Sequence, residues 1–250
     1  MIHSFLLIGQ SNMAGRGFIH EVEPIENKNI KILRNGRWRP LYQPVNNDRD
    51  TAGVNLAESF ADLYQKEHNV EVGLIPCADG GSCMDQWQEG SLLFDHACYM
   101  TELASRTSNI AGILWHQGES DGYDERYPVY EEKLLVMMNA FRKKMGLEDV
   151  PLLLGGLGDY LSHSTKYEYL KNCVYVDEAL QSAAKKLHRC GFVSAEGLTS
   201  NDDFLHFNAK SLREFGERYY REFLKIEDKS RIFEEKSTPD AAIRTEFELL

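Results

Sequence analysis

Short apolar runs alternate with amphipathic segments along most of the chain, and this alternation constrains the fold more than any other feature of the sequence. We interpret five of the runs as buried strands, over residues 5–8, 70–75, 109–115, 150–154 and 192–193. Strands that alternate with helices are typical of a parallel sheet covered on both faces. The sequence therefore predicts an α/β fold, in which ligand sites form beyond the carboxyl ends of the strands.

Helices are predicted from apolar spacing and from capping residues. They are one capped by Asn55, one over residues 127–145, one over 177–189 and one capped by Asn208. Residues 16–54 are expected to be irregular, with Asn35-Gly36 as a turn. The strong apolar period is lost from about residue 227. We therefore expect one domain over residues 1–226, followed by a charged tail or surface helix over 227–250.

The charge balance narrows the range of partners. The chain has 250 residues, of which 42% are hydrophobic and 27% are charged, and its formal net charge is −11. These values are typical of a globular protein with a substantial core. An acidic surface without a basic stripe repels phosphate backbones, so no nucleic-acid partner is expected. No segment approaches the roughly 20 apolar residues that cross a bilayer, so no membrane partner is expected either. A homo-oligomer is left open.

The cysteines indicate neither a zinc site nor a disulfide framework. Their number, five, is odd, and they form no pair of CxxC motifs. We expect no metal and no other cofactor. Free thiols fit a reducing cytoplasm, and the N-terminus shows neither the basic segment nor the cleavage site of a signal peptide. A cytoplasmic location is therefore expected, although a secretion signal that had been removed would leave the same sequence.

Ser11 is the first candidate catalytic residue. It follows the first predicted strand after Gly9, on the tight turn at the carboxyl end of that strand. A serine held there is a candidate nucleophile, and the flanking Gly9 and Gly15 allow close approach of the backbone. The pattern differs from the GxSxG elbow of the α/β-hydrolases. The alternative is a serine that is only solvated or caps a helix.

Asp203 and His206 are candidates for the acid and base that would activate such a serine. They are three residues apart, so a turn would let the carboxylate accept a hydrogen bond from one ring nitrogen. The other ring nitrogen would then be ready to take a proton from a hydroxyl. Asp202 is a rival orienting acid. The alternative is a surface loop in which both aspartates are merely solvated.

Two further loops that follow strands offer hydrogen-bond donors for an oxyanion. Gln117 follows the third strand, and its side-chain amide could donate beside the backbone N–H groups of Ser11 and Gly81. Gly81 is the second glycine of a pair, which leaves room for a carbonyl oxygen. The alternatives are an ordinary turn at Gly80-Gly81 and a hydrogen bond from Gln117 that only orders its own loop.

Further polar and aromatic residues lie near these loops. Five are expected to contact the substrate or to support the groups that do: Gln10, Arg16, Trp115, His116 and Glu119. His116, Glu119 and Asp121 form a polar cluster that either takes part in acid/base chemistry and substrate contact or acts as scaffolding beneath the site. Trp87 and Trp115 either stack on a sugar ring or belong to the core. Arg16 either contacts a polar substrate or is solvated.

Four sequence blocks, in this order, resemble those of the SGNH hydrolases. They are GQSNMAG at 9–15, IPCADGGS at 75–82, WHQGESD at 115–121 and DFLH at 203–206. The third block has glutamine where other SGNH enzymes have asparagine. In this respect it is similar to the carbohydrate esterases that include sialate O-acetylesterases and acetylxylan esterases. The resemblance spans residues 1 to about 225 and implies a flavodoxin-like three-layer α/β/α sandwich with a parallel central sheet.

The resemblance also implies a function and a set of roles. Ser11 would be the nucleophile, His206 the base and Asp203 its orienting acid, with the Ser11 and Gly81 N–H groups and the Gln117 amide as the oxyanion hole. The expected activity is removal of O-acetyl groups from a small acetylated sugar through an acetyl-enzyme, without a metal. Sialic acid, xylo-oligosaccharides and simple acetyl-hexoses all fit.

Two other functions stay open on the sequence alone. One is a glycoside hydrolase that uses a pair of carboxylates such as Glu119 and Asp203. The other is a non-catalytic carbohydrate-binding domain on a hydrolase fold.

Overall fold

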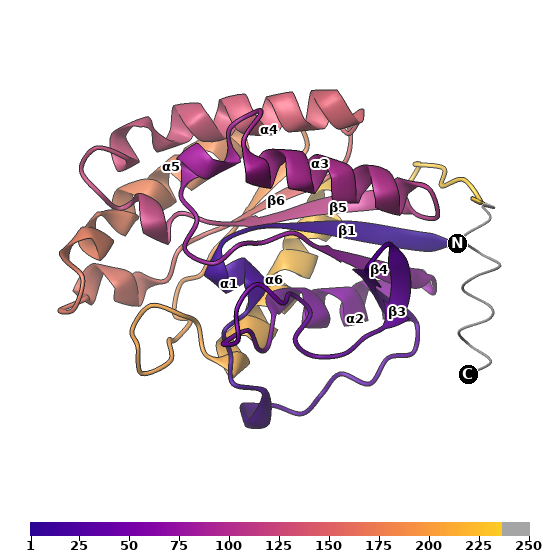
Figure 1. The fold of residues 1–250 in the computed structure, drawn as a ribbon, viewed down its shortest axis with the longest axis horizontal. Helices are drawn as coiled ribbons and strands as arrows, with labels where there is room; N and C mark the ends of the chain where they lie inside the picture. Colours follow the sequence, from indigo (N-terminus) through magenta and orange to yellow (C-terminus); the bar gives the residue numbers. More distant parts are fainter. Residues whose placement is uncertain (237–250) are drawn as a thin grey trace.

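A seven-stranded sheet forms the middle layer of the computed structural model, which describes residues 1–236 (Figure 1). In chain order the strands are β1 (Ile2–Gly9), β2 (Ile30–Arg34), β3 (Arg37–Pro40), β4 (Glu71–Pro76), β5 (Asn109–His116), β6 (Leu152–Gly155) and β7 (Cys190–Val193). Their order across the sheet is β3-β2-β4-β1-β5-β6-β7, and every neighbouring pair is parallel except β2 and β3. The predicted α/β fold with a mainly parallel sheet is confirmed.

The first strand lies where the chain changes direction across the sheet. β1 pairs with β4 on one side and with β5 on the other, and β6 and β7 continue outward from β5. Apart from the β2–β3 hairpin, this is the strand order of the flavodoxin-like doubly wound fold. Ligand sites in such sheets form beyond the carboxyl ends of the strands at this switch point, which here are the ends of β1, β4 and β5.

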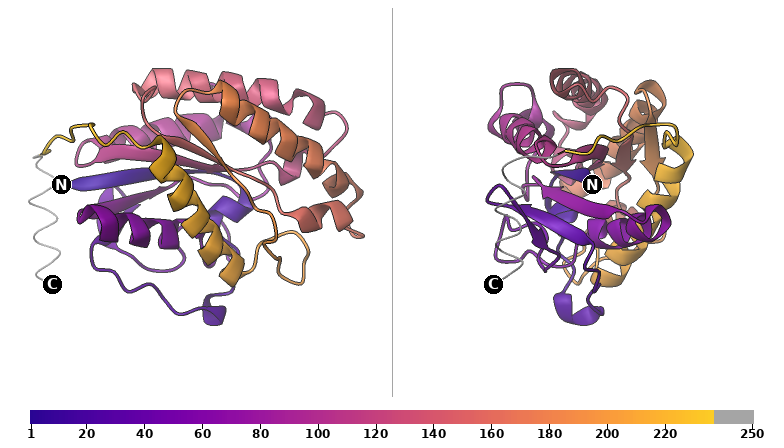
Figure 2. Two further views of the ribbon diagram at one scale, coloured as in Figure 1. Left: turned by 180° about the vertical axis from the view of Figure 1, so that it is seen from behind. Right: turned by 90° about the vertical axis from the view of Figure 1, so that its right-hand side faces the viewer.

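Helices cover both faces of the sheet and make the structure a three-layer sandwich. In chain order they are α1 (Ser11–Ala14), α2 (Leu56–His68), α3 (Leu92–Ser105), α4 (Tyr130–Met145), α5 (Cys173–Lys186) and α6 (Ala209–Ile226). Helices α3, α4 and α5 pack on one face (Figure 1), and α2 and α6 lie side by side on the opposite face (Figure 2). Buried apolar side chains form two core clusters, one beneath each helical layer.

Short 3-10 turns complete the connections between strands and helices. They are η1 (Ile19–Glu21), η2 (Met84–Trp87), η3 (Glu119–Asp121), η4 (Tyr127–Val129), η5 (Asp159–His163) and η6 (Glu168–Asn172). Two of them lie beyond the carboxyl edge of the sheet: η2 comes after β4, just past the second sequence block, and η3 comes after β5 and forms the end of the third block.

The structure confirms the helix starts that the capping residues predict. The Asn55 side chain accepts the N–H of Ala57, and the Glu58 carboxylate accepts the N–H of Asn55, which forms a capping box at the start of α2. Asn208 accepts the N–H of Ser211 at the start of α6. The predicted helix over 177–189 is shifted to α5, because buried Cys173 extends its apolar face toward the N-terminus.

The prediction that residues 16–54 are irregular is wrong in part. Strands β2 and β3 form a hairpin around Asn35-Gly36, where both residues have a positive φ. The expected turn is therefore present, but the strands beside it were not predicted, since Lys31 interrupts the short apolar run of β2. Helix α3, which is capped by Ser91, was not predicted either.

The predicted tail begins where α6 ends. Residues 227–236 are irregular and pass over the amino end of β1 (Figure 1), where the Phe233 ring packs on His3 with centroids 3.9 Å apart. Glu227 also bonds the His68 ring at 2.6 Å. The described part of the tail is thus not a surface helix, and residues 237–250 lie outside the described residues. Among the helices of residues 1–236, none has the length and apolar character that crossing a bilayer requires.

Candidate active site

Ser11 lies directly beyond β1, at the first residue of α1. Strand β1 ends at Gly9, whose φ is +134° and where a Cβ would lie 2.0 Å from the carbonyl oxygen of His116. Glycine permits both the conformation and this close approach to the end of β5. The N–H of Gln10 then bonds the same carbonyl at 2.9 Å. The turn that follows places Ser11 at the carboxyl edge of the sheet.

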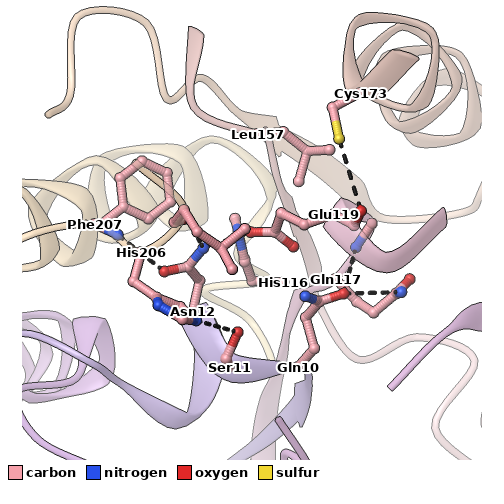
Figure 3. A network of polar contacts seen from close by, with 12 residues as sticks. Gln10, Ser11, Asn12, His116, Gln117, Glu119, Leu157, Cys173, His206 and Phe207 are labelled. Carbon is pink, nitrogen blue, oxygen red and sulfur yellow. Dashed lines mark hydrogen bonds and ion pairs between the residues drawn. The ribbon is translucent and has the colours of Figure 1, made fainter. Parts of the chain in front are cut away.

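A line of hydrogen bonds joins Ser11, His206 and Asp203. The Oγ of Ser11 lies 3.0 Å from Nε2 of His206 (Figure 3). The other ring nitrogen, Nδ1, lies 2.6 Å from Oδ2 of Asp203. Asp203, rather than the exposed Asp202, therefore contacts the ring. The structure brings together the three residues that the sequence nominates as nucleophile, base and orienting acid.

A tight turn in the DFLH block holds the Asp203 carboxylate beneath the imidazole. Its Oδ1 accepts the N–H groups of Leu205 and His206, both at 2.9 Å, and the turn is closed by Phe204 with a φ of +55°. Burial alone would raise the pKa of Asp203. The hydrogen bonds from the His206 ring and from the two amides outweigh burial and lower this pKa to about 2. The carboxylate is therefore ionised at neutral pH.

Two backbone N–H groups are available to an oxyanion at this edge. The first N–H groups of a helix have no partner within it, and the N–H of Ser11 at the start of α1 makes no hydrogen bond to another backbone group of residues 1–236. The N–H of Gly81 makes no hydrogen bond in the part of the chain that the structure describes. Gly81 has a φ of +79°, and a Cβ there would meet nothing within 4 Å, so its conformation rather than its space favours glycine.

A buried ion pair supports the glycine loop. Arg16 and Asp48 form two hydrogen bonds, of 2.7 and 3.1 Å, and both side chains are almost fully buried. The Asp48 carboxylate also accepts the N–H of Gly80 at 2.8 Å. Arg16 therefore supports the loop next to Gly81 and is not solvated. Asp48 has this role without having been singled out, because it lies in the segment expected to be irregular.

Gln117 does not adopt the orientation expected of an oxyanion donor. Its Nε2 lies 3.1 Å from Oε1 of Gln10, 3.0 Å from the carbonyl of Ser82 and 2.5 Å from Oδ2 of Asp121. Three protein acceptors occupy the two amide hydrogens, and the amide is turned toward Gln10 rather than Ser11 (Figure 3). Gln117 here ties the third block to the second, which is the loop-ordering alternative.

Gln10 and Asp121 belong to the same network. Oε1 of Gln10 also accepts the N–H groups of Gly118 and Ser120, both at 3.3 Å. Asp121 accepts the N–H of Met84 with both carboxylate oxygens, and burial raises the pKa of Asp121 to about 6. These side chains support the loops that carry the site.

His116 and Glu119 lie beneath the site and are almost wholly buried. Nε2 of His116 is 3.1 Å from Oε1 of Glu119, and the same oxygen accepts a hydrogen bond of 2.5 Å from Nδ2 of Asn12. Burial alone would raise the pKa of Glu119, but His116 and the Asn12 hydrogen bond outweigh it and lower the pKa. This favours the scaffolding interpretation of the cluster. Asn12 was not predicted, although it stands next to Ser11 in the first block.

The two tryptophans belong to the core. Trp87 and Trp115 are 1% and 0% exposed, and their rings meet edge to face with centroids 5.4 Å apart. For both residues the structure favours the core alternative over stacking on a sugar, since neither ring has an accessible face. Within residues 1–236, no group of three or more histidine, cysteine, aspartate or glutamate side chains is arranged to hold a metal ion.

Comparisons with known proteins place this site in a family. The family described as carbohydrate esterase, sialic acid-specific acetylesterase, matches residues 1–225. The probable carbohydrate esterase At4g34215 of Arabidopsis thaliana is 27% identical over 236 residues, which cover 85% of this chain and 86% of that protein. The crystal structure of the At4g34215 protein is similar with a TM-score of 0.76 at 25% identity, covering 89% of this chain and 98% of that one.

Two more distant structures share the fold. NanS has a TM-score of 0.69 at 17% identity and covers 90% of this chain and 97% of its own. XAC1771, a carbohydrate acetylesterase from Xanthomonas citri, has the same TM-score and identity and covers 90% of this chain and 56% of its own. Both structures therefore share the three-layer sandwich of this chain. With the family match over nine-tenths of its length, the chain belongs to the carbohydrate esterase family of the sialic acid-specific acetylesterases and is a carboxylic ester hydrolase.

Proposed function

We propose that the protein is a serine esterase that removes O-acetyl groups from acetylated carbohydrates through an acetyl-enzyme intermediate. The observation that carries this proposal is the line from Ser11 Oγ to His206 Nε2 and from His206 Nδ1 to Asp203, at 3.0 and 2.6 Å. A nucleophile and a base within hydrogen-bonding distance, with the base oriented by a third group, are the requirement for nucleophilic acyl transfer.

The first half of the reaction acylates the serine. His206 Nε2 takes the Ser11 proton as Oγ attacks the acetyl carbonyl, and the Ser11 and Gly81 N–H groups stabilise the oxyanion that forms. The ionised Asp203 stabilises the imidazolium through Nδ1–H. As the tetrahedral intermediate collapses, the bond from the carbonyl carbon to the sugar oxygen breaks and His206 gives the proton to that oxygen. The sugar leaves as the free alcohol, and Ser11 remains acetylated.

The second half returns the enzyme to its starting state. His206 takes a proton from water, whose oxygen attacks the acetyl carbonyl, and then returns the proton to Ser11 Oγ as acetate leaves. Acetylated carbohydrates are the proposed substrate class, in line with the description of the family as sialic acid-specific acetylesterases and with the relative described as a carbohydrate acetylesterase. Sialic acid, xylo-oligosaccharides and acetyl-hexoses all remain candidates. The five cysteines are free thiols, which supports the proposal that the enzyme works in a reducing compartment such as the cytoplasm.

The geometry gives less support to the two alternatives. A glycoside hydrolase would need Glu119 to face the substrate, but this side chain is 1% exposed and bonded to His116 and Asn12. Asp203, its suggested partner, is held against His206. A non-catalytic binding domain would have no use for an aligned serine and histidine, and it predicts no turnover.

Hydrolysis of p-nitrophenyl acetate by wild type and by Ser11→Ala tests the proposal. We expect kcat to fall by about 10⁴–10⁶ in the variant, the scale seen when one member of a triad is lost. Wild-type turnover in Ser11→Ala would remove Ser11 from this role. Acetate release from a panel of acetylated mono- and oligosaccharides would then identify the sugar, and esters with longer acyl chains serve as the comparison.

A further inference from the structure

The side chain of Asn12 brackets the histidine loop. Its Oδ1 accepts the N–H of Phe207 at 3.0 Å, and its Nδ2 donates to the carbonyl of Leu205 at 3.3 Å. These two backbone groups belong to the residues on either side of His206. The amide thus holds the backbone on both sides of the imidazole, although the two segments lie 193 to 195 residues apart in the chain.

The buried pair beneath Asn12 decides which way its amide faces. Nδ2 also donates to Oε1 of Glu119 at 2.5 Å, and the same oxygen is bonded by the ring of His116. The side chains of Asn12, Glu119 and His116 are 0%, 1% and 0% exposed. A reversed amide would place its oxygen against the ionised carboxylate and its NH₂ against the N–H of Phe207. The carboxylate therefore fixes the orientation that the histidine loop requires.

Asn12 links the position of the nucleophile to the position of the base, because Ser11 and Asn12 are neighbours in the chain. Asn12 directly follows Ser11 in the short helix α1, so the backbone that carries the nucleophile also carries the group that grips the base (Figure 3). His206 is itself only partly buried, and its loop contains the exposed Phe204. The 3.0 Å distance between Ser11 Oγ and His206 Nε2 thus depends on the hydrogen bonds that Asn12, the residue next to Ser11, makes to the histidine loop.

We propose that Asn12 is a positioning residue that holds His206 at hydrogen-bonding distance from Ser11, with Glu119 and His116 fixing the orientation of its amide. This inference rests on the proposed serine esterase function. The Asn12 side chain is fully buried and hydrogen-bonded to Glu119, Leu205 and Phe207, so it acts only through the position of His206. Displacement of a catalytic group by about 1 Å can cost about 10²-fold in rate.

The test compares three purified variants with wild type on p-nitrophenyl acetate. Asn12→Ala removes the amide that bonds the backbone on both sides of His206, and Glu119→Leu removes the carboxylate that orients this amide. We expect kcat to fall about 10²-fold in each variant, with KM changed by less than about threefold. Asn27→Ala is the control, since the amide of Asn27 bonds Asp62 and Gln65 on α2, away from the site. Its kcat should stay within about threefold of wild type.

Asn12→Asp keeps the test decisive if the other variants fold poorly. Its shape is that of asparagine, but an ionised carboxyl cannot donate to Glu119 or to Leu205, whereas a protonated one can donate once. The neighbouring carboxylate raises the pKa of the introduced group. The ratio of its kcat to that of wild type should therefore rise at least about threefold from pH 8 to pH 6. A residue that served only overall stability would leave this ratio unchanged.

The outcomes separate this inference from the proposed function. Absence of wild-type turnover, or full turnover by Ser11→Ala, would reject the esterase proposal itself. If Ser11→Ala is inactive but folded Asn12→Ala retains kcat within about threefold of wild type, the positioning role is overturned and the esterase stands. The positioning role would also be overturned if Asn12→Ala raised KM without lowering kcat, or if the kcat ratio of Asn12→Asp to wild type did not change between pH 8 and pH 6.

Discussion

Replacing Asp48 by alanine should damage both the stability of the protein and its catalytic rate. The carboxylate is paired with Arg16 in a nearly solvent-free position and also accepts the N–H of Gly80. Without it the Arg16 guanidinium is left buried and unpaired. Breaking a buried pair from one side costs about 3–5 kcal/mol. For a domain of this size, about 2–4 °C per kcal/mol gives a fall in Tm of roughly 6–20 °C.

The same substitution should reduce turnover because Gly80 is next to the proposed oxyanion donor Gly81. Without the hydrogen bond from the Gly80 N–H to Asp48 the loop is free to shift. The resulting fall in kcat should approach about 10²–10³-fold, which is the effect of removing an oxyanion donor. Thermal melting by circular dichroism and p-nitrophenyl acetate kinetics below the lowered Tm measure the two effects separately. Lys66→Ala is the control, since its ion pair with Asp62 is exposed and worth about 0–1 kcal/mol.

The pH dependence of this loss gives a second test of the ion pair. Burial alone would raise the pKa of Asp48, but the Arg16 hydrogen bond and charge and the Gly80 N–H outweigh it and lower the pKa. A lowered pKa in the folded state stabilises the protein above the ordinary carboxyl pKa, and this stabilisation is lost as pH falls. The difference in Tm between wild type and Asp48→Ala should thus narrow below about pH 4. A variant with the wild-type Tm at pH 7 would refute the reasoning.

Two further predictions concern the glycine loop and the triad. Gly81→Ala and Gly90→Ala both place a Cβ at a positive φ with nothing within 4 Å. Each variant should therefore lose about 1–2 kcal/mol of unfolding free energy, measured by denaturant unfolding. Only Gly81→Ala should also show a lower kcat. Equal kcat values in the two variants would argue against an oxyanion role for Gly81. Because the pKa of Asp203 is about 2, Asp203 stays ionised and does not contribute to the kcat/KM profile between pH 5 and 8. A flat profile from pH 5 to 8 would speak against a histidine base.

The general position of the site could be predicted from sequence because parallel strands share an edge. Ser11, Gly81 and Gln117 each follow an apolar run, and β1, β4 and β5 are neighbours in the sheet. The DFLH spacing likewise predicted the Asp203–His206 contact, since a three-residue turn brings the carboxylate to the ring. Order along the chain and strand ends were sufficient for these placements.

The orientation of individual side chains could not be predicted in this way. The Gln117 amide is turned by Gln10, Asp121 and the Ser82 carbonyl, three acceptors from three separate segments. Trp115 is the last residue but one of β5, beside the site, but its position in the pleat points the ring into the core. Asp48 comes from a loop without periodicity, where no sequence signal marks a buried ion pair. These features depend on long-range packing, which the local pattern does not encode.

Labelling with a fluorophosphonate, followed by peptide mass spectrometry, tests the central claim most directly. We expect a single adduct on Ser11 that abolishes ester hydrolysis. Labelling should be much slower in His206→Ala, because the serine has lost its base. An active preparation that takes up no label, or that carries the label on another residue, would contradict the claim that Ser11 and His206 form the reacting pair.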